Sequence, residues 1–289
     1  MTVSPPDSLT AILDLAPLGG NRFQGRSPRV GWKRVFGGQV LGQALRAACF
    51  TVEGRLPHSM HAYFLLPGDP ETPIVYEVET LRDGRSFATR RVLARQGEAA
   101  IFAMSVSFQV EEEGFEHQAP MPAVPMPESL PGHAAMLREI LPHLPAPVRA
   151  YFQRERPIEI RPVDLQRYVA PKGMAPNFNV WIKAVSPLPD DPAIHRSVLA
   201  YASDLMLLDT SLVVHGRTAF DPAIQSASLD HALWFHRPFR ADDWLLYAQE
   251  SPSTSGARGF SRGLVFDRDG RLVASVAQEG LIRPRPDLA

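Results

Sequence analysis

The sequence predicts an α+β fold in which one unit, a long apolar helix followed by antiparallel strands, occurs twice. Two helical stretches, 37–49 and 194–208, are apolar on most of their faces, which indicates helices wrapped by other structure. Each is followed by short segments with strand-like alternation and turn residues between them. A proline-rich segment separates the two series. Together these observations predict two antiparallel sheets, each wrapped around its own helix.

Composition and charge narrow the class of protein. Of the 289 residues, 45% are hydrophobic and 21% are charged, and the formal net charge is −1, as in an ordinary globular protein. The chain has no long run of Lys or Arg, which argues against nucleic acid or an anionic membrane as the partner. The single Cys49 excludes an intramolecular disulfide and a thiolate-rich zinc site. We expect a protein that needs no metal and no cofactor.

The sequence also predicts where the protein is found. No apolar stretch reaches the length of a membrane-spanning helix. The first residues lack the basic and then apolar pattern of a secretory signal, and the last four, Pro-Asp-Leu-Ala, are not a peroxisomal address. We therefore expect a cytoplasmic protein.

The first unit begins at Gly37-Gly38-Gln39, where a helical stretch rich in Val, Leu and Ala starts. Strand-like segments follow at 58–66, 74–81, 87–94 and 100–110. Pro67-Gly68 and Asp83-Gly84 end the first two of these segments, and a turn around Gly97 joins the last two into a hairpin.

The second helical stretch, 194–208, contains a carboxylate in an apolar setting. Asp191 and Pro192 precede the stretch, and a capping residue followed by proline is a helix-start signal. Asp204 stands in its middle, and the helical neighbours three and four positions away cannot neutralise it. A buried, unpaired carboxylate requires hydrogen-bond donors or a raised pKa. Asp204 is therefore either a structural residue held by neighbouring strands or a functional residue.

The strands after this helix repeat the order of the first unit. Strand-like segments lie at 229–236, 244–250, 259–266 and 272–282. Phe64 and Pro67 match Phe235 and Pro238 at the same spacing, and an Arg-x-Phe motif precedes an arginine in both units. The shared order of apolar helix and then four strands indicates an internal duplication.

The boundary between the units lies in a segment with three consecutive Glu and then eight prolines between positions 120 and 147. Such a segment resists regular structure and behaves as a linker, although 133–141 could form a short helix within it. We predict an N-terminal unit at 1–112, a linker at 113–149 and a C-terminal unit at 150–289. Two sheets wrapped around two apolar helices define a double hotdog, and the alternative is an α+β sandwich with two packed helices.

Several motifs resemble the acyl-CoA thioesterase II family. In the first half they are Gly37-Gly38-Gln39-Val40-Leu41-Gly42-Gln43-Ala44, His58-Ser59-Met60-His61-Ala62-Tyr63-Phe64 and Arg82-Asp83-Gly84-Arg85-Ser86-Phe87. In the second half they are Ser228-Leu229-Asp230-His231-Ala232-Leu233-Trp234-Phe235-His236-Arg237-Pro238 and Val276-Ala277-Gln278-Glu279-Gly280. The resemblance extends from about Gly31 to Arg283 and is weakest in the proline-rich linker.

The resemblance implies a double-hotdog fold and hydrolysis of fatty acyl-CoA to free acid and coenzyme A. The family's catalytic carboxylate falls on Asp204, its hydroxyl residue on Ser228 and its amide on Gln278. That hydroxyl residue is commonly Thr in the family, and Ser keeps the hydroxyl but loses the methyl group that stiffens the side chain. The resemblance further implies a homodimer of double hotdogs.

Thioester hydrolysis needs a positioned water, a base and donors for the developing oxyanion. Asp204 can accept the water's proton, while Ser228 and Gln278 can orient the water and hold the carboxylate. Burial would raise the pKa of Asp204 and these donors would lower it, so the sequence leaves the outcome open. We expect substrate contacts from Gly38, whose N–H lies at a helix start, and from His58, although capping and a structural histidine are the alternatives.

Two rival functions remain open. A hotdog hydratase relies on an Asp–His pair, but no histidine follows Asp204 at helical spacing. A non-catalytic acyl-CoA-binding protein would not need the three residues at positions 204, 228 and 278. The chain also has no Gly-x-Ser-x-Gly motif, which disfavours an α/β-hydrolase thioesterase.

Overall fold

The computed structural model describes residues 8–28, 34–144, 149, 152–154, 156–169, 174–219 and 221–285. Its strands are β1 Ala16–Gly19, β2 Arg22–Gly25, β3 Leu56–Phe64, β4 Ile74–Asp83, β5 Phe87–Gln96, β6 Ala99–Gln109, β7 Ile158–Pro162, β8 Asn177–Ala184, β9 Ile224–Ser228, β10 Asp230–Phe235, β11 Leu245–Ser255, β12 Arg258–Phe266 and β13 Leu272–Pro284. Its helices are α1 Leu9–Ile12, α2 Gly37–Cys49, α3 His133–Ile140, α5 Gln166–Val169, α6 Pro192–Ser203 and α7 Thr210–Val213, with single 3₁₀ turns η1 Pro127–Ser129 and η2 Leu141–His143.

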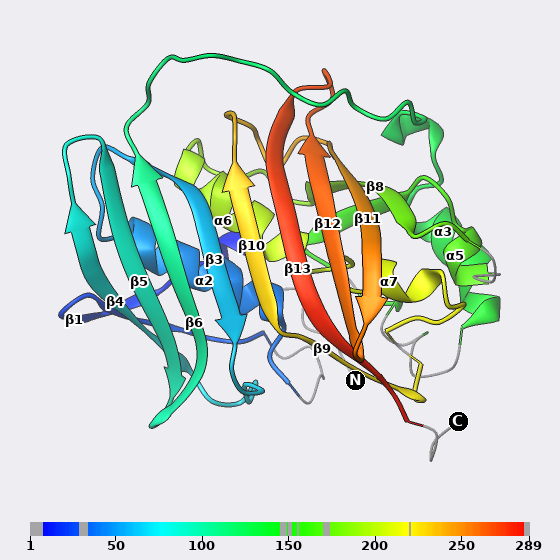
Figure 1. Ribbon diagram of the computed structural model, residues 1–289, viewed down its shortest axis with the longest axis horizontal. Helices are drawn as coiled ribbons and strands as arrows, with labels where there is room; N and C mark the ends of the chain where they lie inside the picture. Colours follow the sequence, from blue (N-terminus) through cyan, green and yellow to red (C-terminus); the bar gives the residue numbers. More distant parts are fainter. Residues whose placement is uncertain are drawn as a thin grey trace.

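The strands form one continuous antiparallel sheet in the order β1-β2-β4-β5-β6-β3-β10-β13-β12-β11-β8-β7, and β9 pairs with the end of β13. Figure 1 shows β3 and β10 side by side at its centre, with α2 and α6 against one face. The pairing of Met60 with Leu233 lies at this junction. The predicted division into two sheets is therefore corrected, because β3 and β10 satisfy each other's edge hydrogen bonds and join the two halves.

Side chains alternate along each strand between a buried, mostly apolar inner face and an open outer face. In β5 every second residue from Ala88 to Ala94 is buried, while the residues between them are at least partly exposed. The buried side chains of the sheet pack against α2 and α6 in one main cluster. A sheet with one covered and one open face is typical of antiparallel structure.

The two central helices run antiparallel and approach each other closely. A Cβ atom added at Gly38 would collide with the Tyr201 carbonyl oxygen, and one at Gly42 would lie 2.9 Å from the Ser197 carbonyl oxygen. At the far end Arg46 of α2 reaches Asp191, the N-cap residue of α6. Glycine in the first half of α2 thus allows backbone-to-backbone packing that brings the start of α2 to the end of α6.

The α6 helix is shorter than the sequence predicts. It ends at Ser203, so Asp204 is its C-cap residue, with φ −90° and ψ −2°, rather than a residue in its middle. Ser203 Oγ donates to the Ala200 carbonyl (3.0 Å), a local bond that competes with continuation of the helix. The apolar residues after Asp204, which suggested more helix, instead form a turn that lies over the sheet.

The strands β3–β6 and β10–β13 confirm the predicted segments, and α3 confirms the short helix in the proline-rich region. The strands β1, β2, β7, β8 and β9 were not predicted. Of these, β1 is exposed throughout and β9 carries a single large apolar residue, so neither shows the alternation that identifies a strand.

The connection after β6 has no regular structure from 110 to 126, and Figure 1 shows it arching from β6 towards the C-terminal half. Gln118 Nε2 donates to the Gly270 carbonyl (2.8 Å), and Trp181 Nε1 donates to the Pro125 carbonyl (2.9 Å). Among the described helices, none has the length and apolar character needed to cross a membrane.

Candidate active site

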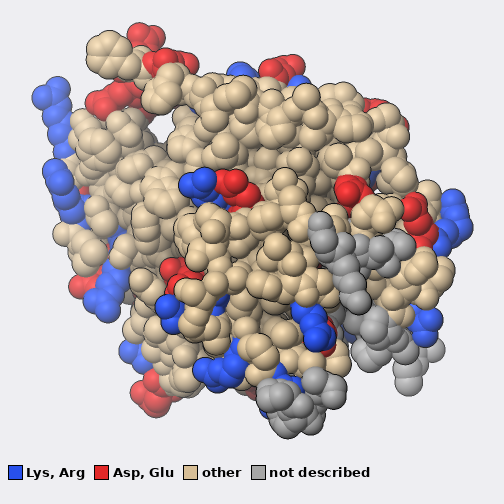
Figure 2. All heavy atoms as spheres, turned by 45° about the vertical axis from the view of Figure 1, so that its right-hand side comes forward, with Lys and Arg blue, Asp and Glu red and all other residues tan. Residues whose placement is uncertain are grey.

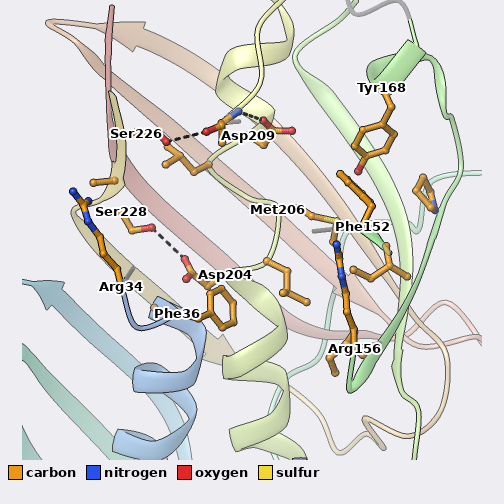
Figure 3. Close-up of a pocket in the computed structure, with 18 of the residues that line it drawn as sticks. Arg34, Phe36, Phe152, Arg156, Tyr168, Asp204, Met206, Asp209, Ser226 and Ser228 are labelled. Atoms are coloured by element: carbon orange, nitrogen blue, oxygen red, sulfur yellow. Dashed lines mark hydrogen bonds between the residues drawn. The ribbon is translucent and has the colours of Figure 1, made fainter. Parts of the chain in front are cut away.

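The Asp204 carboxylate lies where the end of α6 meets the start of α2. Its side chain is only 5% exposed. Gln278 Nε2 on β13 donates to Asp204 Oδ1 at 2.7 Å, and Ser228 Oγ at the end of β9 donates to the same oxygen at 3.3 Å. Figure 3 shows Ser228 and Asp204 facing each other beside the first turn of α2. The three residues chosen from the sequence therefore meet at one point.

The first turn of α2 supplies a third donor. The Gly38 backbone N–H donates to the Asp204 carboxylate. The N-cap residue of α2 is Phe36, whose side chain cannot accept a hydrogen bond from the free N–H groups of the first turn. Asp204, at the end of α6, takes the place of a capping side chain for α2. The positive end of the α2 dipole also favours a negative charge at this position.

Burial and hydrogen bonding act on Asp204 in opposite directions. Burial raises the pKa of Asp204 from 3.8 to about 6, while the donors Gln278, Ser228 and Gly38 lower it. The effect of burial is the larger of the two, but the donors limit the rise in pKa, so the carboxyl group is ionised near neutral pH. Among the described residues no Lys or Arg forms an ion pair with it.

His231 on β10 approaches the same carboxylate without bonding to it. The distance from His231 Nδ1 to Asp204 Oδ1 is 4.0 Å, and burial lowers the pKa of His231 to about 3, so the ring is neutral. Ser203 Oγ lies 2.8 Å from His231 Nε2 and donates its one proton to the Ala200 carbonyl. The neutral ring and Ser203 share one hydrogen bond at Nε2, while Nδ1 has no hydrogen-bond partner among the described residues.

A cavity of about 680 Å³ opens from the Asp204 carboxylate. One wall comes from the start of α2 and from Ser226, Ala227 and Ser228 of β9. Figure 3 shows Phe152, Arg156 and Tyr168 on the opposite side, with Met206 between them and Asp204. Met136, Ile158 and Ile160 complete an apolar wall that the sequence did not identify. A pocket of mostly apolar lining with a few polar groups is typical of a small-molecule site.

The two predicted substrate contacts fall in different places. Gly38 lies beside Asp204, but its N–H is engaged by the carboxylate rather than directed to a ligand. His58 does not line the cavity: its Nε2 lies 2.8 Å from Ser107 Oγ and its ring packs edge-on against Phe87. The structure therefore does not bring His58 to Asp204.

His231 is the residue near the carboxylate whose proximity the sequence did not reveal. It lies next to Asp230 on a strand, and only the pairing of that strand with its neighbours brings the ring to Asp204. Among the described residues no group of three His, Cys, Asp or Glu side chains could hold a metal ion. On the face shown in Figure 2, acidic and basic side chains are interspersed.

Comparison with solved structures defines the class first. A hot dog fold protein from Alicyclobacillus acidocaldarius, 20% identical, superposes with a TM-score of 0.76 over 95% of this chain and 97% of that chain. The sheet and its central helices therefore form a hotdog fold.

The sequence then defines the family. Residues 147–281 match the acyl-CoA thioesterase family, and residues 24–109 match the acyl-CoA thioesterase N-terminal domain. Acyl-CoA thioesterase 2 of Haemophilus influenzae is 41% identical over 96% of this chain and 97% of its own length. Acyl-CoA thioesterase II TesB2 of Mycobacterium marinum is 43% identical, with a TM-score of 0.80 over 97% of this chain and all of that chain. The chain belongs to the acyl-CoA thioesterase II family.

Proposed function

We propose that this protein hydrolyses acyl-CoA thioesters with Asp204 as the base that activates water. Membership of the acyl-CoA thioesterase II family gives the hydrolase activity, and the observation that carries the mechanism is the buried carboxylate with amide and hydroxyl donors at the end of a cavity. Gln278 and Ser228 both donate to Oδ1. The other oxygen, Oδ2, lies next to Gly37 and can accept from a water in the cavity.

The reaction then needs one proton acceptor that later becomes a donor. Water attacks the thioester carbonyl carbon as Asp204 takes one of its protons. The tetrahedral intermediate breaks its C–S bond, and the leaving thiolate of coenzyme A receives the proton from the Asp204 carboxyl group. A pKa of about 6 suits both steps near neutral pH, because the group is ionised at rest and releases its proton readily.

The cavity supports an acyl-CoA as the ligand. Its apolar wall of Met136, Ile158 and Ile160 suits an acyl chain. Arg34 and Arg156 also line it, and guanidinium groups form charge-assisted hydrogen bonds with phosphates such as those of coenzyme A. Gln278, Ser228 and Gly38 hold the carboxylate in place, so we assign them to the catalytic group and not to the acyl pocket.

The geometry also bears on the hydratase alternative. A histidine does lie near Asp204, but His231 is neutral, its Nδ1 lies 4.0 Å from Asp204 Oδ1, and its Nε2 is hydrogen-bonded to Ser203 Oγ. Asp204 is hydrogen-bonded to an amide and a hydroxyl instead. This arrangement favours activation of water by the carboxylate alone.

The test is the Asp204→Asn variant, which keeps the size of the side chain and removes the base. We expect kcat for coenzyme A release, followed with a thiol-reactive dye, to fall by about 10³-fold, within the usual contribution of a general base. Asp191→Asn, at the other end of the same helix, is the matched control and should keep full turnover.

Turnover of folded Asp204→Asn near the parent level would contradict the mechanism. A parent protein that binds a non-hydrolysable thioether analogue of acyl-CoA but releases no coenzyme A from acyl-CoAs of graded chain length would indicate the binding-protein alternative.

We further propose that the chain consists of two hotdog units, 1–112 and 150–289, joined by the linker 113–149, and that it forms a homodimer. The two family matches, on residues 24–109 and 147–281, and the irregular segment 110–126 support the division. Tyr63, Leu65 and Leu66, which are about half exposed or more, offer apolar area for association. Light scattering on a size-exclusion column should give twice the mass of the chain, and a monomer would contradict the dimer.

A further inference from the structure

Three polar side chains form a row on the inner face of the C-terminal half of the sheet. They are Gln278 on β13, Ser261 on β12 and Gln249 on β11, and they are 1%, 0% and 2% exposed. Ser261 is the direct register partner of Gln278. Gln249 pairs with Gly263, two residues along from Ser261, so Gln249 and Ser261 are diagonal neighbours on the same face.

The segment 204–211 covers this row. Leu208 packs on Gly280 and Ser211 packs on Gly259, since a Cβ atom at either glycine would collide with those side chains. Thr210 Oγ1 donates to Gln249 Oε1 at 3.0 Å. The segment that begins at Asp204 therefore crosses β13, β12 and β11 and closes the polar row off from solvent.

Each of the three side chains keeps one polar atom without a hydrogen-bond partner among the described residues. These atoms are Gln278 Oε1, Ser261 Oγ and Gln249 Nε2. The first can only accept, the second can accept or donate, and the third can only donate. One water molecule could accept from Gln249 Nε2, donate to Gln278 Oε1 and bond to Ser261 Oγ, and buried waters usually make about three such bonds.

We propose that Ser261 and Gln249 are positioning residues that hold the Gln278 carboxamide, through one buried water, with its nitrogen towards Asp204. The two ends of a carboxamide have nearly the same shape, so its orientation depends on the partners at each end. A reversed amide would place Oε1 against the Asp204 carboxylate and remove the 2.7 Å donor bond. A partner for Oε1 at the far end prevents that reversal. The inference rests on the proposed roles of Asp204 and Gln278.

The first test uses Ser261→Ala and Gln249→Met, each of which removes one partner from the row. We expect kcat to fall about tenfold, the effect of losing one hydrogen bond in the transition state, while KM stays within about twofold. The acid limb of the kcat/KM profile should move to higher pH, because a carboxylate that loses a donor ionises less readily. The other groups that face Asp204 are unchanged, namely Ser228, the Gly38 N–H, neutral His231 and the neutral phenol Tyr247.

Ser251→Ala is the matched control. Ser251 is also buried on β11, but its Oγ already has a partner, the Phe260 carbonyl (2.7 Å), and so needs no bridging water. This variant should lower the urea midpoint and leave the acid limb in place. If Ser261→Ala behaves in the same way, losing stability with unchanged kcat and acid limb, then Ser261 is structural only and the inference is overturned.

The second test is a double-mutant cycle that combines Ser261→Ala with Gln278→Met, a side chain of similar length with no amide to orient. In that background Ser261→Ala should cause no further loss of kcat, and the changes in urea midpoint should be less than additive. The midpoint reports the coupling even where turnover is too slow to measure. Additive changes would overturn the inference.

The same variants separate the two proposals. Full activity in Ser261→Ala and Gln249→Met, beside inactive Asp204→Asn and Gln278→Met, would remove only the positioning role. Full activity in Gln278→Met would remove Gln278 from the proposed mechanism and the positioning role with it.

Discussion

The two ends of the α2–α6 pair are built from equivalent parts and treat a carboxylate in opposite ways. At one end Asp191 caps α6, since its carboxylate accepts a hydrogen bond from the Ala193 N–H (2.9 Å). The same carboxylate forms an ion pair with Arg46 of α2 at 3.1 Å. The Arg46 guanidinium in turn lies 4.6 Å from the centre of the Phe50 ring. At the other end Asp204 follows α6 and meets the start of α2 without a cation.

The difference separates a carboxylate with a structural role from the one that we propose to be catalytic. Asp191 has a side chain that is 39% exposed and neutralised by a cation, so its charge costs little. The Asp204 side chain is 5% exposed and held only by neutral donors, so burying its charge costs free energy and its pKa is raised. Of the two carboxylates, only Asp204 lines the cavity in which we propose that the substrate binds.

The largest expected effect on stability is at the Asp204 end of the helix pair, where removing the charge should stabilise the protein. Because burial raises the folded-state pKa of Asp204 from 3.8 to about 6, folding costs free energy wherever the unfolded group would be ionised. The free energy of unfolding at pH 7 should therefore be higher for Asp204→Asn than for the parent, by on the order of 3 kcal/mol. The advantage should shrink as the pH falls from about 6 to about 4 and then disappear. Urea unfolding across this range measures it, and a destabilised variant at pH 7 would contradict it.

A smaller but sharp effect is expected at the contact between α2 and Asp204. A Cβ atom at Gly37 would lie 2.6 Å from Asp204 Oδ2 and 2.9 Å from the Phe64 ring. Gly37→Ala should displace the carboxylate and lower kcat by about 10²-fold, as misplacement of a reacting group by about 1 Å does. Gly114→Ala is the control, since no atom lies within 4 Å of the added Cβ. Unchanged kcat in Gly37→Ala would show that Oδ2 is not the reacting oxygen.

The pH profile should identify which titrating group at this end controls turnover. We expect kcat/KM to rise with pH through an apparent pKa of about 6, since the ionised form of Asp204 is the base that we propose. His231→Gln should leave that limb in place, because the pKa of His231 is lowered to about 3 and glutamine can keep a hydrogen bond to Ser203. If the acid limb moves or disappears in His231→Gln, then the histidine and not Asp204 controls the pH dependence of turnover.

The smallest effect is expected at the structural end. Asp191→Asn removes the pairing with Arg46 but keeps a side chain able to cap α6. The variant should lose no more than about 1 kcal/mol of stability, as for other partly exposed ion pairs. Thermal unfolding and the turnover assay measure this. A gain in stability like that expected at Asp204 would erase the distinction between the two ends.

The sequence predicted the parts of the fold that depend on local pattern. The mostly apolar stretch after Gly37 predicted α2, and alternation predicted β3–β6 and β10–β13. A lone carboxylate among apolar residues singled out Asp204. The residues themselves did not identify Ser228 and Gln278 as its partners, and only the resemblance to the family connected them.

What the sequence could not predict depends on contacts between distant segments. The end of α6 at Ser203 is set partly by a side-chain bond, and the apolar residues beyond it pack on glycines of β12 and β13. The approach of His231 to Asp204 depends on strand register, and the junction of β3 with β10 depends on which edge strands meet. None of these leaves a periodic signal in the chain.

The junction between β3 and β10 has a consequence for how the enzyme matures. Gly38 comes from the first half of the chain, while Asp204, Ser228 and Gln278 come from the second, so neither half holds all four residues of the proposed catalytic group. Pairings between segments so far apart in the chain form slowly, because a long loop must close first. On dilution from denaturant, the circular dichroism signal of the strands should recover before catalytic turnover does. The recovery of enzyme activity thus reports the rate at which the two halves of the chain dock.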